Sequence, residues 1–185
     1  MADEASIKGV SLVHLRDYLV SHHGEEGLHQ VLQALSPESA QVLNRPFATD
    51  WYPLKTMVAI ERAIIDQFHG GDPREAYRFG QYDLERAVSR IYRIIFPLLD
   101  PTFLVKKSAR LFQSMISQGR VRIEQPNPRH LYVYLEELDP LDEVYCNDWR
   151  GSLIGMFKAC GVDCEVRHDE CRLRGAPHCR YQVTW

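Results

Sequence analysis

The sequence predicts an α+β fold in which a helical N-terminal part is followed by a four-stranded antiparallel sheet. Two observations predict it. Apolar residues recur at helical spacing through most of residues 7–117, and after Gln118-Gly119 the apolar period falls to two, as in half-buried strands. The strand-like segments come in two pairs with one helix between them, giving the order strand–strand–helix–strand–strand. We expect a single domain over residues 1–185, with a helical part at 1–118 and a sheet part at 119–185.

Local start and stop signals divide the first part into helices. Gly24 is expected to end the first of them. Later helices are expected to begin at Ser36, Asp72 and Asp100, because each is a capping side chain followed by a proline, which suits the first helical position. Residues 47–53 are expected to form an aromatic loop. The predicted helices are residues 7–23, 25–35, 36–44, 53–68, 72–80, 82–99 and 100–117.

The second part alternates apolar and polar residues in four segments. A turn at Pro126-Asn127-Pro128 joins the first two segments, and the last two form a closing hairpin. Between the pairs, a helix at residues 142–160 ends at Gly161. The predicted strands are residues 120–125, 130–138, 164–173 and 178–185.

Composition narrows the class of protein. The net charge of −3 gives no indication of the basic surface that is typical of nucleic-acid-binding proteins. The N-terminus lacks an apolar signal core and no stretch approaches eighteen apolar residues, so we expect a cytoplasmic protein without a membrane span. The count of five cysteines is odd, which in a reducing compartment argues against a disulfide framework.

All five cysteines lie in the last forty or so residues, where their spacing suggests a metal site. His168 and Cys171 are separated by two residues, so one tight turn can offer both to a tetrahedral ion. Cys146 from an earlier element and Cys179 from a following strand would complete a Cys3His set. Such a set is closed, and therefore structural rather than catalytic. The alternative is that these cysteines are small buried core residues.

A family resemblance supports the interpretation of these residues as a metal site. The run from Cys146 to Gly151, together with His168-Asp-Glu-Cys171, Gly175 and Cys179-Arg-Tyr181, resembles the vinyl-4-reductase domain. That family has a cysteine before a glycine-containing helix, then Glu-x-x-Cys, a glycine and Cys-x-aromatic, and members bind zinc through the Cys, Glu, Cys and Cys positions. The resemblance implies structural zinc at Cys146, Cys171 and Cys179, with His168 in place of the glutamate.

A second resemblance lies nearer the N-terminus. Ile7-Lys-Gly9-Val10 and His23-Gly24-Glu25-Glu26 are similar to the beginning of haem–nitric oxide/oxygen binding (H-NOX) domains, and Phe79-Gly80-Gln81-Tyr82 is similar to the segment ahead of their haem-binding helix. The two families are grouped in one superfamily with the lipid-holding subunits of the TRAPP vesicle-tethering complex. The chain resembles a bacterial, stand-alone member of that superfamily.

The same resemblance raises the question of haem, and the sequence argues against it. An axial histidine would be expected on the helix after Phe79-Gly80, yet residues 82–129 contain no histidine. The tyrosine–serine–arginine signature that H-NOX domains use for the haem carboxylates is absent as well. We therefore predict zinc, and not haem, as the cofactor.

The resemblance also implies a cavity for a small apolar or aromatic ligand. No G-x-S-x-G, phosphate loop or H-E-x-x-H motif is present, so we predict no enzymatic activity. The candidate lining residues, whose alternative role is plain core packing, are Phe112, Met115, Tyr132, Tyr134, Trp149 and Phe157.

We therefore predict a non-enzymatic sensing domain in which a bound ligand shifts helix packing and signals through a protein partner or a second copy of the chain. Two alternatives remain open. One is an interaction scaffold with a solid core and no ligand. The other is a redox sensor that acts through Cys160 or Cys164.

Overall fold

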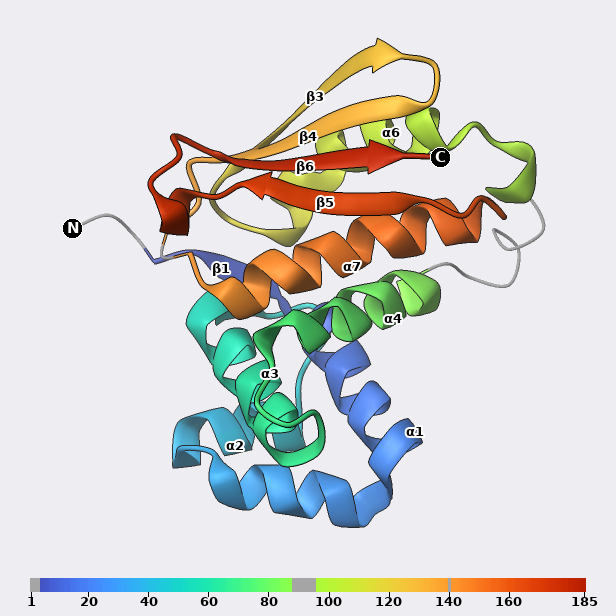
Figure 1. The fold of residues 1–185 in the computed structure, drawn as a ribbon. Coiled ribbons are helices and arrows are strands. Elements are labelled where there is room, and N and C mark those ends of the chain that lie inside the picture. The colour runs from blue at the N-terminus through green and yellow to red at the C-terminus, as the bar shows by residue number, and fades with distance from the viewer. Residues whose placement is uncertain (1–3, 88–95, 140) are drawn as a thin grey trace.

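A computed structural model of the chain describes residues 4–87, 96–139 and 141–185. The helices α1, α2 and α3 gather at one end of the molecule, and the four-stranded sheet lies at the other (Figure 1). Between them α4 and α7 run side by side in the most extensive helix–helix contact of the described residues (Figure 1). This arrangement confirms the predicted α+β fold.

The first helices begin and end where the sequence signals them. Helix α1 (Gly9–Ala34) breaks at Gly24, whose φ of 71° is open to glycine at little cost. Helix α2 (Pro37–Asn44) begins at Ser36, whose hydroxyl accepts a hydrogen bond from the Ser39 amide. Helix α3 (Leu54–Phe68) follows and buries Met57, Ile60, Ile64 and other apolar residues on one face.

The predictions for residues 7–8 and 51–53 were wrong. Ser6–Lys8 forms strand β1 and Trp51–Pro53 forms strand β2, and the two pair antiparallel with Ile7 opposite Tyr52. Ile7 also makes an isolated bridge to Ile116. Both partners are distant in the sequence, so the local apolar pattern showed only the helix that begins at Gly9.

The middle of the chain has one helix boundary fewer than the sequence predicts. Asp72 caps a 3₁₀ turn (Pro73–Ala76), which continues directly into α4 (Tyr77–Ala87) without the predicted break after residue 80. The predicted helix at 82–99 falls partly outside the described residues, and the chain resumes in a 3₁₀ turn (Phe96–Leu98). Helix α6 (Pro101–Met115) then begins as predicted at Asp100, whose carboxylate accepts from the Phe103 amide.

The sheet has the strand order β3-β4-β6-β5, and every neighbouring pair is antiparallel. Its strands are β3 (Arg120–Asn127), β4 (His130–Glu136), β5 (Glu165–Glu170) and β6 (Cys179–Thr184), with α7 (Glu143–Ala159) between the pairs in sequence. Alternate residues of the two central strands are buried beneath the helices. They are Leu131, Val133, Leu135, Cys179, Tyr181 and Val183.

The crossing of α4 and α7 depends on two glycines. A Cβ on Gly151 would lie 1.8 Å from the Tyr77 carbonyl oxygen, and one on Gly80 would lie 1.9 Å from the Asp148 carbonyl oxygen. The two backbones therefore approach more closely than any other residue type permits. This crossing places Asp83 of α4 and Asp148 of α7 around one small pocket.

Candidate functional site

A cavity of about 580 Å³ that could hold a ligand lies between α1, α4, α6, α7 and the sheet. Ligand pockets are typically about 300–1,000 Å³ and mostly apolar, so both its size and its walls suit a small organic molecule. Among the apolar side chains that line it are Val10, Leu84, Val105, Phe112, Met115 and Trp149.

Three of the six predicted lining residues lie at this cavity. Phe112 and Trp149 meet edge to face, with ring centroids 5.4 Å apart, and Met115 lies beside them on α6. Phe157 is instead fully buried against Trp185, with ring centroids 4.9 Å apart.

Tyr132 and Tyr134 lie away from the cavity, because their neighbour Val133 is the residue of β4 that lines it and successive strand residues face opposite sides. Each tyrosine ring is covered by an arginine. The Arg180 guanidinium lies 5.0 Å from the Tyr132 ring centroid, and that of Arg122 lies 3.7 Å from the Tyr134 centroid.

Polar groups meet at one end of the cavity. His14 of α1 and Asp83 of α4 both line it, with Nδ1 of the imidazole 2.5 Å from Oδ1 of the carboxylate. The Ser11 hydroxyl donates to the other oxygen of Asp83 at 3.0 Å. Asp83 is thereby held from two consecutive turns of α1. Sequence reasoning missed these residues, because a single histidine on an amphipathic helix carries no spacing signal.

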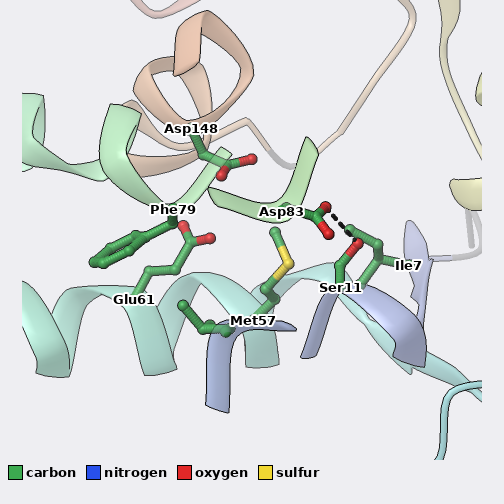
Figure 2. A pocket seen from close by; sticks show the side chains of 8 residues that line it. Ile7, Ser11, Met57, Glu61, Phe79, Asp83 and Asp148 are labelled. Carbon is green, nitrogen blue, oxygen red and sulfur yellow. Dashed lines mark hydrogen bonds between the residues drawn. The ribbon is translucent and has the colours of Figure 1, made fainter. Parts of the chain in front are cut away.

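Behind Asp83 a small pocket of about 20 Å³, enough for one water molecule, is surrounded by carboxyl groups from three helices. Figure 2 shows Glu61 of α3, Asp83 of α4 and Asp148 of α7 gathered around this space. Glu61 is only 1% exposed, and one of its oxygens has no hydrogen-bond partner among the described residues. Burial, and then the negative charges of Asp148 and Asp83, raise the pKa of Glu61 well above its ordinary value.

This burial predicts the effect of Glu61→Gln on stability. The pKa of Glu61 is higher in the folded protein than in the unfolded chain. The side chain therefore contributes fully to stability at pH values below its pKa in the unfolded chain. This contribution is lost as the pH rises through its pKa in the folded protein. The uncharged amide escapes that loss. At pH 8 we expect the variant to unfold at a higher urea concentration than the parent, with a free energy of unfolding about 1–2 kcal/mol larger. At pH 4 we expect no such gain. Equal destabilisation at both pH values would contradict this account.

The four predicted metal ligands come together at the junction of α7 with the β5–β6 hairpin. Cys146 lies in α7, His168 in β5, Cys171 just after β5 and Cys179 at the start of β6. One ligand atom from each lies within 4.8 Å of all the others, and the sulfur atoms of Cys171 and Cys179 are 3.9 Å apart. Ligand atoms around a tetrahedral ion with bonds of about 2.3 Å lie roughly 3.8 Å apart, so small adjustments suffice.

The surroundings of this cluster hold its members in place. The three cysteines are buried, and the His168 ring stacks on Tyr181 with centroids 4.4 Å apart. Nε2 of His168 is buried without a hydrogen-bond partner among the described residues. A hydrogen bond from Cys146 lowers the pKa of Cys179 to about 4 and raises that of Cys146. The cluster is therefore suited to carry a thiolate.

The remaining two cysteines lie outside the cluster. Cys160 is buried and Cys164 half-buried, and burial raises the pKa of both thiols, that of Cys164 to about 11. Reactive cysteines require the opposite shift. Neither thiol has the environment that redox sensing through it would need.

No protein-family profile and no curated protein matches the chain. Solved structures do match it. An H-NOX protein from Shewanella oneidensis in the Fe(II)NO ligation state has a TM-score of 0.75 at 18% identity, covering 96% of this chain and 98% of that one. An Fe(II) unliganded H-NOX protein from K. algicida has a TM-score of 0.73 at 10% identity, with 96% of each chain covered.

A third solved structure, described by the modulation of haem redox potential through porphyrin distortion, has a TM-score of 0.70 at 12% identity. It covers 97% of this chain and 100% of that one. These neighbours support the H-NOX part of the predicted resemblance. They give no support to its vinyl-4-reductase and TRAPP parts.

The same neighbours correct the cofactor prediction. We expected structural zinc and argued against haem, but the solved proteins of this fold are described in iron ligation states and, in one case, by their haem. The helix after Phe79-Gly80 forms only part of the cavity wall, which is built from elements far apart in the sequence and includes His14. The chain has the fold of H-NOX domains, and this finding overturns the prediction of zinc with haem excluded.

Proposed function

We propose that the chain is a sensing domain that holds haem in the cavity between α1, α4, α6, α7 and the sheet. The observation that carries the proposal is this cavity of about 580 Å³ within a fold whose solved neighbours are haem proteins. No described helix combines the length and the apolar character needed to cross a bilayer.

The residues present fit such a group in two respects. The apolar side chains of Val105, Phe112 and Trp149 suit the faces of a porphyrin, and the imidazole of His14 is a ligand that haem iron accepts. When bound, haem would supply an iron centre for a small gas, as in the neighbour studied with nitric oxide. The chain itself would orient the group and exclude water from it.

The cavity walls also offer a route for a signal. They come from α1, α4, α6, α7 and two strands of the sheet. A bound ligand would therefore contact several helices that pack on one another and on the sheet. A ligand that binds one packing arrangement better than another shifts the population toward it. We propose that a protein partner or a second copy of the chain responds to this shift, and that the domain has no enzymatic activity of its own.

A cavity-filling substitution tests this proposal. Val105 on α6 is 1% exposed and lines the cavity, so Val105→Trp should occupy the space and weaken haem binding at least about tenfold in an absorption titration of the purified chain. Tyr132→Leu, on the other side of the sheet, is the matched control and should bind as the parent does. Equal binding by all three proteins would place the haem elsewhere, and no saturable binding by the parent would refute the proposal.

We also propose that Cys146, His168, Cys171 and Cys179 form a closed ligand set for one soft metal ion that ties α7 to the β5–β6 hairpin. The mutual approach of their ligand atoms within 4.8 Å supports this. Thiolate-rich sets select soft ions, and four protein ligands leave no open position for catalysis. The identity of the ion follows from elemental analysis.

A further inference from the structure

We infer that His14 would be the protein ligand to the haem iron and that Asp83 is the positioning residue that orients it. The inference rests on the proposed haem function. It assigns the iron ligand to α1, and not to the helix after Phe79-Gly80 where the H-NOX resemblance places it.

The position of His14 is the first support. It lies in the second turn of α1, and it lines the cavity together with Val10 and Ser11. Its side chain is 17% exposed, so the surrounding protein shields most of the ring from solvent. Since a helix holds such a side chain rigidly, the imidazole is presented to the cavity in a defined orientation.

The hydrogen bonding of His14 is the second support. Asp83 lies 2.5 Å from Nδ1, so in the neutral ring this nitrogen is the donor and the lone pair is on Nε2. Nε2 is then the ring nitrogen that can bind a metal. Metal-binding histidines almost always donate their other N–H to a carboxylate, carbonyl or water, which fixes the tautomer and raises the basicity of the ligating nitrogen.

The fixation of Asp83 is the third support. The Ser11 hydroxyl, one turn before His14 on α1, donates to its second oxygen, as the dashed line in Figure 2 shows. Glu61 and Asp148 line the same small pocket as Asp83, so side chains of α3 and α7 also enclose this carboxylate. The carboxylate is thereby fixed against Nδ1 and holds the imidazole in one orientation.

No other imidazole competes for the role. The chain has eight histidines, residues 88–95 contain none, and His14 is the one that lines the cavity in the described part of the chain. Three other residues in the wall belong to types that are known to bind haem iron: Met115, Met156 and Tyr145. They are the alternatives that the experiment must separate from His14.

The experiment compares haem-loaded full-length variants by absorption and resonance Raman spectroscopy. We expect His14→Gly to lose the iron–histidine band and to bind haem about 100-fold more weakly, and added imidazole to restore both. Asp83→Asn should keep the band but shift its frequency, with about 10-fold weaker binding. His22→Ala, which alters a histidine outside the cavity, is the control and should leave the spectrum unchanged.

The possible failures are distinguishable. If the parent binds haem and His14→Gly gives the same spectrum, the haem function stands and the assignment of His14 is overturned, with a methionine or tyrosine as the ligand. If the parent binds no haem, the proposed function fails and this inference with it. Circular dichroism establishes that each variant is folded, and imidazole rescue separates a lost ligand from a damaged fold.

Discussion

Gly151→Ala is expected to destabilise the protein by about 3 kcal/mol or more. The new methyl group would lie 1.8 Å from the Tyr77 carbonyl oxygen, and neither helix backbone can move without disturbing the whole α4–α7 contact. The loss should appear as a shift of the urea unfolding midpoint at constant slope.

Gly155 on the same helix provides the matched control. A Cβ at this position would lie 3.1 Å from the Gln81 carbonyl oxygen and from the Leu84 Cβ, a contact that a shift of a few tenths of an ångström relieves. Alanine is also favoured over glycine in a helix by up to about 1 kcal/mol. We expect Gly155→Ala to be near neutral, and an equal loss in both variants would contradict the close crossing at Gly151.

Cys171→Ser is expected to abolish the metal binding proposed for the cysteine–histidine set and to lower the free energy of unfolding by several kcal/mol. Binding of an ion to a closed set of ligands from α7 and the hairpin contributes directly to folding, so the loss of one thiolate removes much of that energy. The measurements are elemental analysis of the purified protein and thermal unfolding with and without a chelator.

Cys164→Ser is the control for this experiment, because Cys164 lies outside the cluster and should keep the metal content of the parent. The chelator should destabilise the parent and the control, and leave Cys171→Ser unchanged. A parent that holds no metal when freshly prepared would show that the three buried cysteines serve only as core residues.

Much of the fold could be predicted because its signals are local. Ser36, Asp72, Asp100 and Asp142 each accept a backbone hydrogen bond at the start of a helix or turn. The change of apolar period after Gly119 marked the sheet. The short β1–β2 pair was missed because its strands are three residues long and more than forty residues apart, so no periodicity can develop.

The candidate sites were also predictable only as far as their residues are close together in the sequence. The cysteine–histidine set could be found because His168 and Cys171 are neighbours in sequence, although their approach to Cys146 is a property of the fold. The cavity was found only in part. Strand periodicity showed that Tyr132 and Val133 face opposite ways, but not which of them faces the helices.

His14 and Glu61 could not be predicted, because their roles arise from contacts made across the helical part of the chain. Asp83, the partner of His14, is sixty-nine positions away, and the acidic neighbours of Glu61 come from two other helices. Single polar residues on amphipathic helices are ordinary in a sequence. Only the packing of α1, α3, α4 and α7 makes these two exceptional.

The most direct test of the proposed function is the haem content of the full chain, purified from cells supplied with a haem precursor, alongside Val105→Trp. We expect about one haem per parent chain, a sharp absorption maximum of protein-bound haem, and little haem in the variant. The proposal would be contradicted if the parent protein contained no haem and also bound none when titrated. The cavity would then be a site for an organic ligand without iron.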